Sequence, residues 1–145
     1  MKINVTNDFS EVTGLRYCNI SDKSGEEFYH TLLNEKFKEA VDKKEKLEVI
    51  LDGTGDDGYS PSFIDEAFGN LVYDFGKDLV NKYLIVISES EPYIKDQIKD
   101  MTIPQWSSRR AQKEEPVVTE NHSEWYRFTD DRGFVRKRWI DVPNK

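Results

Sequence analysis

The stretch LEVILDGTGDDGYSPSFIDEAFGNLV, residues 47–72, decides the fold of this chain. It begins with a short aliphatic run that ends at Asp52, a pattern typical of a buried strand. Glycines and aspartates over residues 53–58 then predict a loop. From Phe63 onward, apolar residues recur at helical spacing as far as Gly76, a residue type that often ends helices. The stretch therefore predicts a strand, a loop and a helix in direct succession.

The segments before this stretch predict two short strands and a long helix. INV (3–5) and GLRYCNI (14–20) have the apolar content of short strands. Residues 21–46 predict a helix, in which Ser24 and Glu27 have the spacing of a capping box. The apolar stripe of this helix comprises Phe28, Leu32, Leu33, Phe37 and Val41.

The segments after it continue the alternation of strands and helices. KYLIVIS (82–88) predicts a strand, and residues 90–101 predict a short helix. Alternation of this kind is typical of α/β domains. Because both longer strands are continuously apolar, we expect helices to cover both faces of their sheet.

The last third of the chain differs from the rest in charge and composition. Residues 1–100 carry 12 Lys and Arg against 21 Asp and Glu, whereas residues 101–145 carry 9 against 7 and hold all three tryptophans. Residues 124–142 predict a β-hairpin with its turn at 130–133, and residues 102–118 predict a linker or a partly helical strap. We therefore expect an acidic α/β domain over 1–100, followed by a basic, Trp-containing extension over 101–145.

Overall composition argues against several functional classes. The net charge of −7 disfavours general binding to nucleic acid or to anionic membranes. No segment reaches the roughly 20 apolar residues of a membrane span, and the first residues lack the apolar core of a signal peptide. The single cysteine, Cys18, permits no internal disulfide, which suits a cytoplasmic protein. Its place in the apolar run 14–20 favours a buried thiol in a strand over a nucleophile.

The glycine- and aspartate-rich loop matches none of three catalytic or metal-binding motifs. The Asp-Gly-Thr sequence resembles a phosphatase motif, but Ile50 occupies the place of its nucleophilic aspartate. A calcium loop that started at Asp52 would require glycine and glutamate where Asp57 and Phe63 stand. The glycines also lack the Gly-Lys-Ser/Thr of a phosphate-binding loop. The carboxylates could hold magnesium weakly, although a solvated turn is favoured.

Neither histidine has the surroundings expected of a catalytic residue. His30 falls beside the apolar face of its helix and His122 lies among loop residues, so a solvated side chain is favoured for each. No nucleophile can be paired with a base. We therefore expect a protein that is not an enzyme and that has no catalytic residue, no cofactor and no metal ligand.

Two hydroxyl groups lie at the expected start of the helix after the loop. Ser60 precedes Pro61, and Ser62 stands three residues before Asp65, so each serine is a candidate helix cap. A phosphate on either hydroxyl would lie at the favourable end of the helix dipole and add about two negative charges to the surface. Capping is favoured for at least one of the two serines.

Residues 47–72 resemble the STAS-like family of small bacterial proteins. In that family a strand ending in aspartate leads through a glycine-containing loop to a Ser-Phe-x-(Asp/Glu)-Glu helix start, followed by an aromatic residue and a glycine. The matching residues are Asp52, Ser62, Phe63, Glu66, Phe68 and Gly69. The resemblance covers roughly residues 1–100. It implies an α/β layered fold with a central mixed sheet and helices packed on it, to which the chain adds a C-terminal β-hairpin extension.

The resemblance also implies a function. The family is similar to sulfate-transporter and anti-sigma-factor-antagonist domains, which are non-enzymatic modules that bind proteins. It thus implies a regulatory module whose partner is a histidine-kinase-like ATPase or an anti-sigma-type protein. In the antagonists, a phosphorylated serine lies at this same junction. The candidates for partner binding or phosphorylation are therefore Ser62, Ser60, Asp52, Asp56, Asp57 and Tyr59.

An alternative function uses the predicted hairpin. Its residues mix cations with aromatic rings, as the binding surfaces of single-stranded nucleic acids do. A hairpin packed on the acidic domain explains the same pattern. The residues that would carry this alternative, a nucleic-acid-associated regulator, are Arg132, Arg136, Lys137, Arg138 and Trp139.

Overall fold

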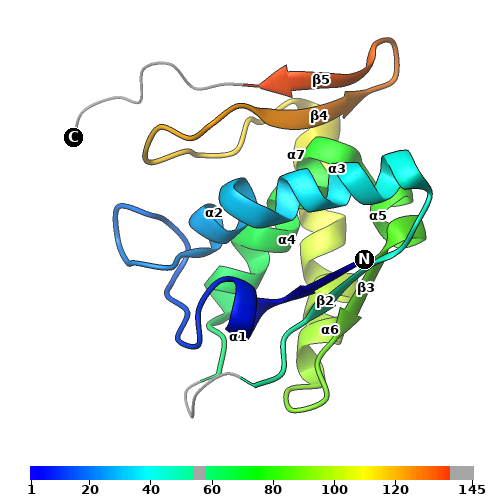
Figure 1. Ribbon diagram of the computed structural model, residues 1–145. Helices are drawn as coiled ribbons and strands as arrows, with labels where there is room; N and C mark the ends of the chain where they lie inside the picture. The colour runs from blue at the N-terminus through cyan, green and yellow to red at the C-terminus, as the bar shows by residue number, and fades with distance from the viewer. Residues whose placement is uncertain (54–57, 138–145) are drawn as a thin grey trace.

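Three parallel strands form the central sheet of the protein. A computed structural model describes residues 1–53 and 58–137 (Figure 1). The strands β1 (Lys2–Asn4), β2 (Leu47–Ile50) and β3 (Leu84–Ile87) lie in the order β1-β2-β3. Both strand pairs are parallel, because helical connections return the chain to the same edge of the sheet before each new strand. The expected mixed character is therefore absent from the described part of this sheet.

Helices bury most of one face of this sheet and leave the other partly open. Val49 is fully buried and lies opposite the buried Ile3 in the neighbouring strand. On the other face, Glu48 is only partly buried, and its cross-strand neighbour Ile85 is 38% exposed. The expectation of two covered faces is thus wrong for this short sheet. Although β2 is apolar at most positions, only alternate residues along it are fully buried.

Residues 14–20, expected to form a strand, are a loop. A short helix, α1 (Val5–Asp8), directly follows β1. The loop then runs beside the start of α2 (Gly25–Phe28), where the carbonyls of Leu15 and Arg16 accept hydrogen bonds from the first N–H groups of this helix. These carbonyls satisfy helix donors that lack partners within the helix, instead of pairing with a strand.

The first long helical segment runs from Gly25 to Lys43. It comprises α2, a π-helical turn η1 (Tyr29–Leu33) and α3 (Asn34–Lys43). The Oγ atom of Ser24 accepts a hydrogen bond from the N–H of Glu27, which confirms Ser24 as the helix cap. The predicted apolar stripe faces the core, with three of its members fully buried and two partly buried against them.

Helix α4 (Pro61–Phe75) passes through the centre of the molecule. Its predicted apolar face is buried, as the helical spacing indicated; the residues concerned are Phe63, Ala67, Phe68, Leu71, Val72 and Phe75. The polar residues Glu66, Asn70 and Asp74 are also buried. A helix that is buried all round must be covered on both sides. The second cover comes from the end of the chain.

That cover begins with a helix where a linker or partly helical strap was expected. After α5 (Lys77–Tyr83), β3 and α6 (Tyr93–Gln97), the chain continues through a second π-helical turn, η2 (Ile98–Thr102), into α7 (Ile103–Gln112). Helix α7 packs against α4 at Gly69, where an added Cβ atom would lie 2.1 Å from the indole ring of Trp106. Only glycine permits so close an approach.

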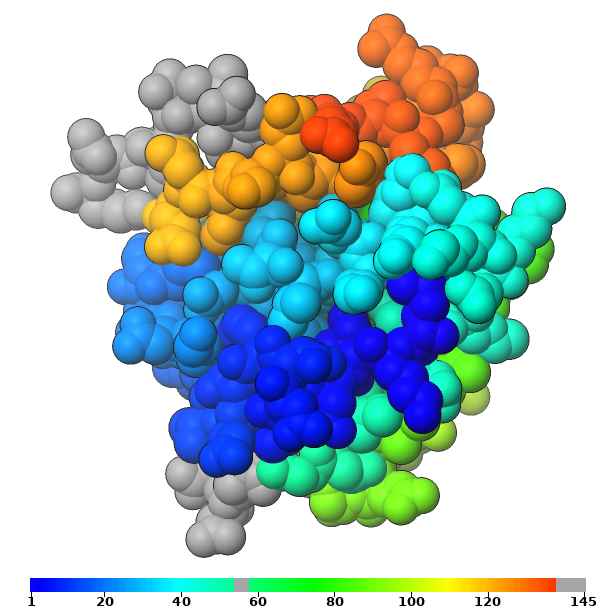
Figure 2. All heavy atoms as spheres, in the orientation of Figure 1, coloured from blue at the N-terminus to red at the C-terminus, as the bar shows by residue number. Residues whose placement is uncertain are grey.

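The remaining cover is a pair of antiparallel strands, β4 (Trp125–Thr129) and β5 (Gly133–Lys137). Phe134 of β5 packs against Phe75 at the end of α4, with ring centroids 5.7 Å apart. The space-filling view shows the residues of β4 and β5 seated directly on those of α3 (Figure 2). The extension and the α/β domain thus share one core. None of the helices in the described ranges is long and apolar enough to cross a membrane.

Candidate functional site

Asp52 fastens the carboxyl end of β2 to the loop that follows β3. Its Oδ1 atom accepts hydrogen bonds of 2.8 Å from both the N–H and the hydroxyl of Ser90. Its backbone carbonyl accepts a 3.2 Å hydrogen bond from Thr6. The backbone donor of Ser90 in particular lowers the pKa of the Asp52 carboxyl. Asp52 is therefore an ionised residue that holds three segments together at the edge of the sheet.

Glycines give the loop after Asp52 its backbone geometry. Gly53 and Gly58 have φ values of +90° and +65°. At Gly58, an added Cβ atom would also lie 2.6 Å from a carboxylate oxygen of Glu91. Asp56 and Asp57, two of the candidate binding residues, lie outside the described residues.

Ser60, and not Ser62, caps α4. The Ser60 Oγ atom accepts a 3.1 Å hydrogen bond from the N–H of Phe63 and donates one of 3.1 Å to the carbonyl of Gly14. Ser62 lies within the first turn, half-buried, with its Oγ atom 3.3 Å from that of Ser60. The capping box expected from Ser62 and Asp65 does not form, because the Asp65 carboxylate accepts hydrogen bonds from Arg16, Thr102 and Trp106 instead.

Tyr59 lies in the core. Its side chain is 5% exposed, and its ring packs against that of Phe63 with centroids 5.6 Å apart. Burial, followed by the charges of Glu91 and Asp52, raises the pKa of its hydroxyl. That hydroxyl is buried without a hydrogen-bond partner among residues 1–53 and 58–137. Tyr59 thus packs inside the protein and does not face outward with the serines.

Exposed residues surround the start of α4. Pro61 is exposed, and its carbonyl accepts a 3.0 Å hydrogen bond from Gln97 of α6. Tyr93, at the start of α6, is 57% exposed. We call this region, at the carboxyl edge of the parallel sheet, the junction surface; it comprises Asp52, Gly53, Pro61, Ser62, Ser90 and Tyr93.

The basic residues of β4 and β5 are largely engaged with the protein itself. Arg136 lies over the ring of Tyr126 and donates a 2.8 Å hydrogen bond to its hydroxyl. Arg127, which the sequence did not single out, forms ion pairs with the buried Asp74 and with the exposed Glu115. Of the candidate nucleic-acid contacts, Arg132 is exposed in the turn and Lys137 is partly buried. Arg138 and Trp139 lie outside the described residues.

A buried cluster that the sequence did not indicate lies at the start of α2. The carboxylate of Glu26 is fully buried and accepts four hydrogen bonds. Its Oε1 atom receives the N–H of Cys18 at 3.0 Å and the hydroxyl of Thr119 at 2.5 Å. Its Oε2 atom pairs with the N–H of Thr119 at 2.9 Å and with Nε2 of His122 at 2.6 Å. Burial alone would raise the pKa of Glu26, but these hydrogen bonds, led by that of His122, lower it to about 2.

Both histidines belong to this region, so the expectation of solvated rings is wrong. The His122 side chain is 5% exposed, and its ring stacks on that of His30 with centroids 4.2 Å apart. Burial, with the neighbouring His122, lowers the pKa of His30 to about 3. Cys18 is half-buried in a loop rather than in a strand. No local pattern could reveal the cluster, because Glu26 and His122 are 96 residues apart.

A match to a known protein family covers the strand, loop and helix at the junction surface. Residues 24–93 match the family model described as a STAS-like domain of unknown function (DUF4325). The match includes Glu26, β2, α4 and β3, whereas Cys18 and His122 lie outside it. No curated protein and no solved structure matches the chain. Through residues 24–93, this chain is therefore similar to the STAS-like domains of that family.

Proposed function

We propose that this protein is a bacterial, cytoplasmic regulatory module that acts by binding another protein at the junction surface, and not by catalysis. The hydroxyl of Ser62 carries the proposal. Because Ser60 already caps α4, the Ser62 hydroxyl is not needed for that purpose and lies half-buried in the first turn. A residue that can be modified without loss of the cap suits a regulatory switch.

Phosphorylation of Ser62 would change the junction surface strongly. The phosphate would lie in the first turn of α4, a helix of 15 residues, where the helix dipole favours negative charge. It would add about two negative charges to the junction surface. A partner that contacts these residues would then meet a different electrostatic surface. The family resemblance suggests a histidine-kinase-like ATPase or an anti-sigma-type protein as this partner.

The experiment compares charge variants of one surface as baits. Wild-type protein, Ser62→Asp and Ser108→Asp are used to capture proteins from a lysate of the source cells, and mass spectrometry identifies what binds. Ser108 is exposed on α7, away from the junction surface, so its variant controls for added charge. The affinity of each captured protein for each bait is then measured with purified components.

We expect a protein of the stated class to bind wild type and Ser108→Asp equally, and to bind Ser62→Asp at least tenfold more weakly. Thermal unfolding must show that all three baits are folded. Equal affinity for Ser62→Asp and wild type would show that Ser62 is not a switch. If no protein is retained more strongly than on an unrelated acidic protein, the proposed binding function is wrong.

A further inference from the structure

Three metal-ligating side chains from separate segments converge at the start of α2. The Sγ atom of Cys18, a carboxylate oxygen of Glu26 and a ring nitrogen of His122 all lie within 4.8 Å of one another. Cys18 belongs to the loop before α2, Glu26 to its first turn and His122 to the segment before β4. We propose that these residues bind Zn²⁺, and that the ion joins the C-terminal extension to the STAS-like domain.

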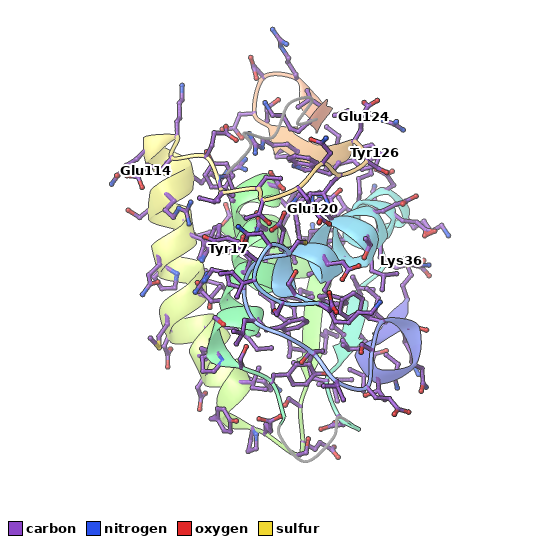
Figure 3. The ribbon with its side chains drawn as sticks, turned by 90° about the vertical axis from the view of Figure 1, so that its left-hand side faces the viewer. Tyr17, Lys36, Glu114, Glu120, Glu124 and Tyr126 are labelled. Carbon is purple, nitrogen blue, oxygen red and sulfur yellow. The ribbon has the colours of Figure 1, made fainter. Side chains whose placement is uncertain are left out.

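The approach of the two outer segments is visible in the structure. Figure 3 shows Glu120, two residues before His122, on the chain segment that passes the loop carrying Tyr17. The backbone N–H of Asn19 donates a 3.2 Å hydrogen bond to Thr119 across this contact. The donor atoms thus meet where two parts of the chain, about 100 residues apart, are already held together.

The chemistry of the three donors selects zinc. Thiolate, imidazole and carboxylate are all common zinc ligands, whereas calcium and magnesium prefer oxygen ligands throughout. One thiolate, one carboxylate and one neutral imidazole balance the charge of a divalent cation. Glu120 adds further negative charge next to Cys18. A fourth coordination position remains for an additional ligand.

The side chain of Cys18 is placed to supply the sulfur ligand of this site. Its Sγ atom lies 3.3 Å from the hydroxyl of Ser24. A zinc ion would stabilise the thiolate in place of the thiol, and the proton would be released on binding.

The surroundings hold the Glu26 carboxylate in place for an ion. It accepts hydrogen bonds from the backbone N–H of Cys18 and from Thr119, and these leave the Cys18 sulfur and the His122 ring nitrogen free to bind an ion. An ion would replace only the hydrogen bond between Glu26 and His122, and the remaining donors would keep the carboxylate oriented. Outer contacts of this kind raise metal affinity in known sites.

The His122 ring is similarly constrained, and an access route exists. It stacks on His30, whose ring also contacts Trp125 with centroids 4.4 Å apart. A cavity of about 320 Å³, lined by both histidines and by Glu124 and Arg136, leads from the surface to His122.

The test uses the full chain and cobalt as a spectroscopic substitute for zinc. Protein purified in the presence of a chelator and then freed of it is titrated with Co²⁺ and afterwards with Zn²⁺. We expect one equivalent of cobalt to produce the charge-transfer absorption of a cobalt–thiolate bond, and zinc to abolish it. The melting temperature of the wild type should also rise when zinc is added.

Three variants assign the signal to the proposed ligands. Cys18→Ser should lose the cobalt–thiolate absorption, and His122→Gln should bind zinc at least tenfold more weakly than wild type. Glu114→Gln removes an exposed carboxylate that neither belongs to the cluster nor lines this cavity, and it should bind both ions like wild type. Circular dichroism checks that each variant is folded.

The wild-type spectrum alone can overturn the proposal, so it does not depend on how well the variants fold. If cobalt gives no thiolate absorption with wild type, the cluster is a hydrogen-bonded contact and not a zinc site. The proposal is equally wrong if Cys18→Ser and His122→Gln bind zinc with wild-type affinity. Neither result bears on the junction surface, which shares no residue with this site.

Discussion

At the scale of single residues, Ser60 and Ser62 show that two neighbouring serines at the start of a helix differ in role, because only Ser60 caps the helix. Ser60 precedes the helix, so its side chain reaches back to the free N–H of Phe63. Ser62 is already inside the first turn, where its hydroxyl lies 3.3 Å from that of Ser60. The sequence leaves both serines as candidate caps, because Ser60 directly precedes Pro61 and Ser62 stands three residues before Asp65.

This difference predicts opposite sensitivities for the two serines. Ser60→Ala should lower the free energy of unfolding by about 0.5–2 kcal/mol, because the N–H of Phe63 would lose its acceptor. Ser62→Ala should change it by less than about 0.5 kcal/mol. Denaturant unfolding of both variants measures this directly. A larger loss for Ser62→Ala than for Ser60→Ala would show that the cap has been assigned to the wrong serine.

Glu66 is a second residue whose surroundings have a measurable consequence. Its side chain is 1% exposed and accepts hydrogen bonds from Asn70 at 2.7 Å and from Arg16 at 3.1 Å. Burial dominates over these two donors, and the nearby Glu26 of α2 adds to it, so the pKa of Glu66 rises to about 7. The folded protein therefore holds a proton that the unfolded chain releases at lower pH.

Stability should consequently fall with rising pH in a defined range. The ordinary pKa of 4.5 applies to the unfolded chain, so the contribution of protonated Glu66 is complete below that pH and is lost as the pH approaches 7. A tenfold difference in proton affinity is about 1.4 kcal/mol. Between pH 5 and pH 8, wild type should therefore lose on the order of 3 kcal/mol relative to Glu66→Gln. Identical pH profiles for the two proteins would mean that Glu66 is ionised throughout.

At the scale of elements, the predictable parts are those whose signal is local. The spacing of apolar residues was enough to place the long helical segment from Gly25 to Lys43, the core face of α4 and the strands β2 and β3. The loop at 14–20 was mistaken for a strand because its apolar residues resemble one, although its carbonyls serve the start of α2. Long-range contacts decided that case, as they decide the Cys18, Glu26 and His122 cluster. A pattern within a short window contains no information about either.

The antiparallel strands β4 and β5 illustrate the same limit of pattern reading. Their mixture of cations and aromatic rings suggests nucleic-acid binding, yet Arg127 is paired with the buried carboxylate of Asp74 and Phe134 packs on the core. We expect no detectable binding of single-stranded oligonucleotides even at low salt. Fluorescence anisotropy of labelled oligonucleotides measures this. Binding that weakens steeply with salt, and that is lost when Arg136, Lys137 and Arg138 are changed to alanine, would contradict the expectation.

At the scale of the whole molecule, the family domain and the extension form one packed body. The family match ends at residue 93, but α7 beyond it covers α4, and Trp106 of α7 is 2% exposed. The acidic and basic parts of the sequence thus do not correspond to separate cores. Instead, opposite charges from the two parts form ion pairs with each other, such as that of Arg127 with Asp74.

The contact between Gly69 and Trp106 tests this unity. Gly69→Ala should destabilise the protein by about 1–3 kcal/mol, because the new methyl group overlaps the indole ring. In a Trp106→Ala background, which itself should cost about 3–5 kcal/mol, the sign should reverse. Alanine then has room and favours a helix by about 1 kcal/mol over glycine. Thermal or denaturant unfolding of the four proteins decides; additive losses would show that the two residues do not touch.

The close approach at Gly69 also has an evolutionary consequence. Gly69 lies within the residues that match the family model, whereas the indole that requires a glycine there comes from a segment beyond that match. The two positions should therefore covary among relatives. Lineages that lack an aromatic residue after the domain should be free to replace the glycine with alanine, and lineages that keep the aromatic residue should not.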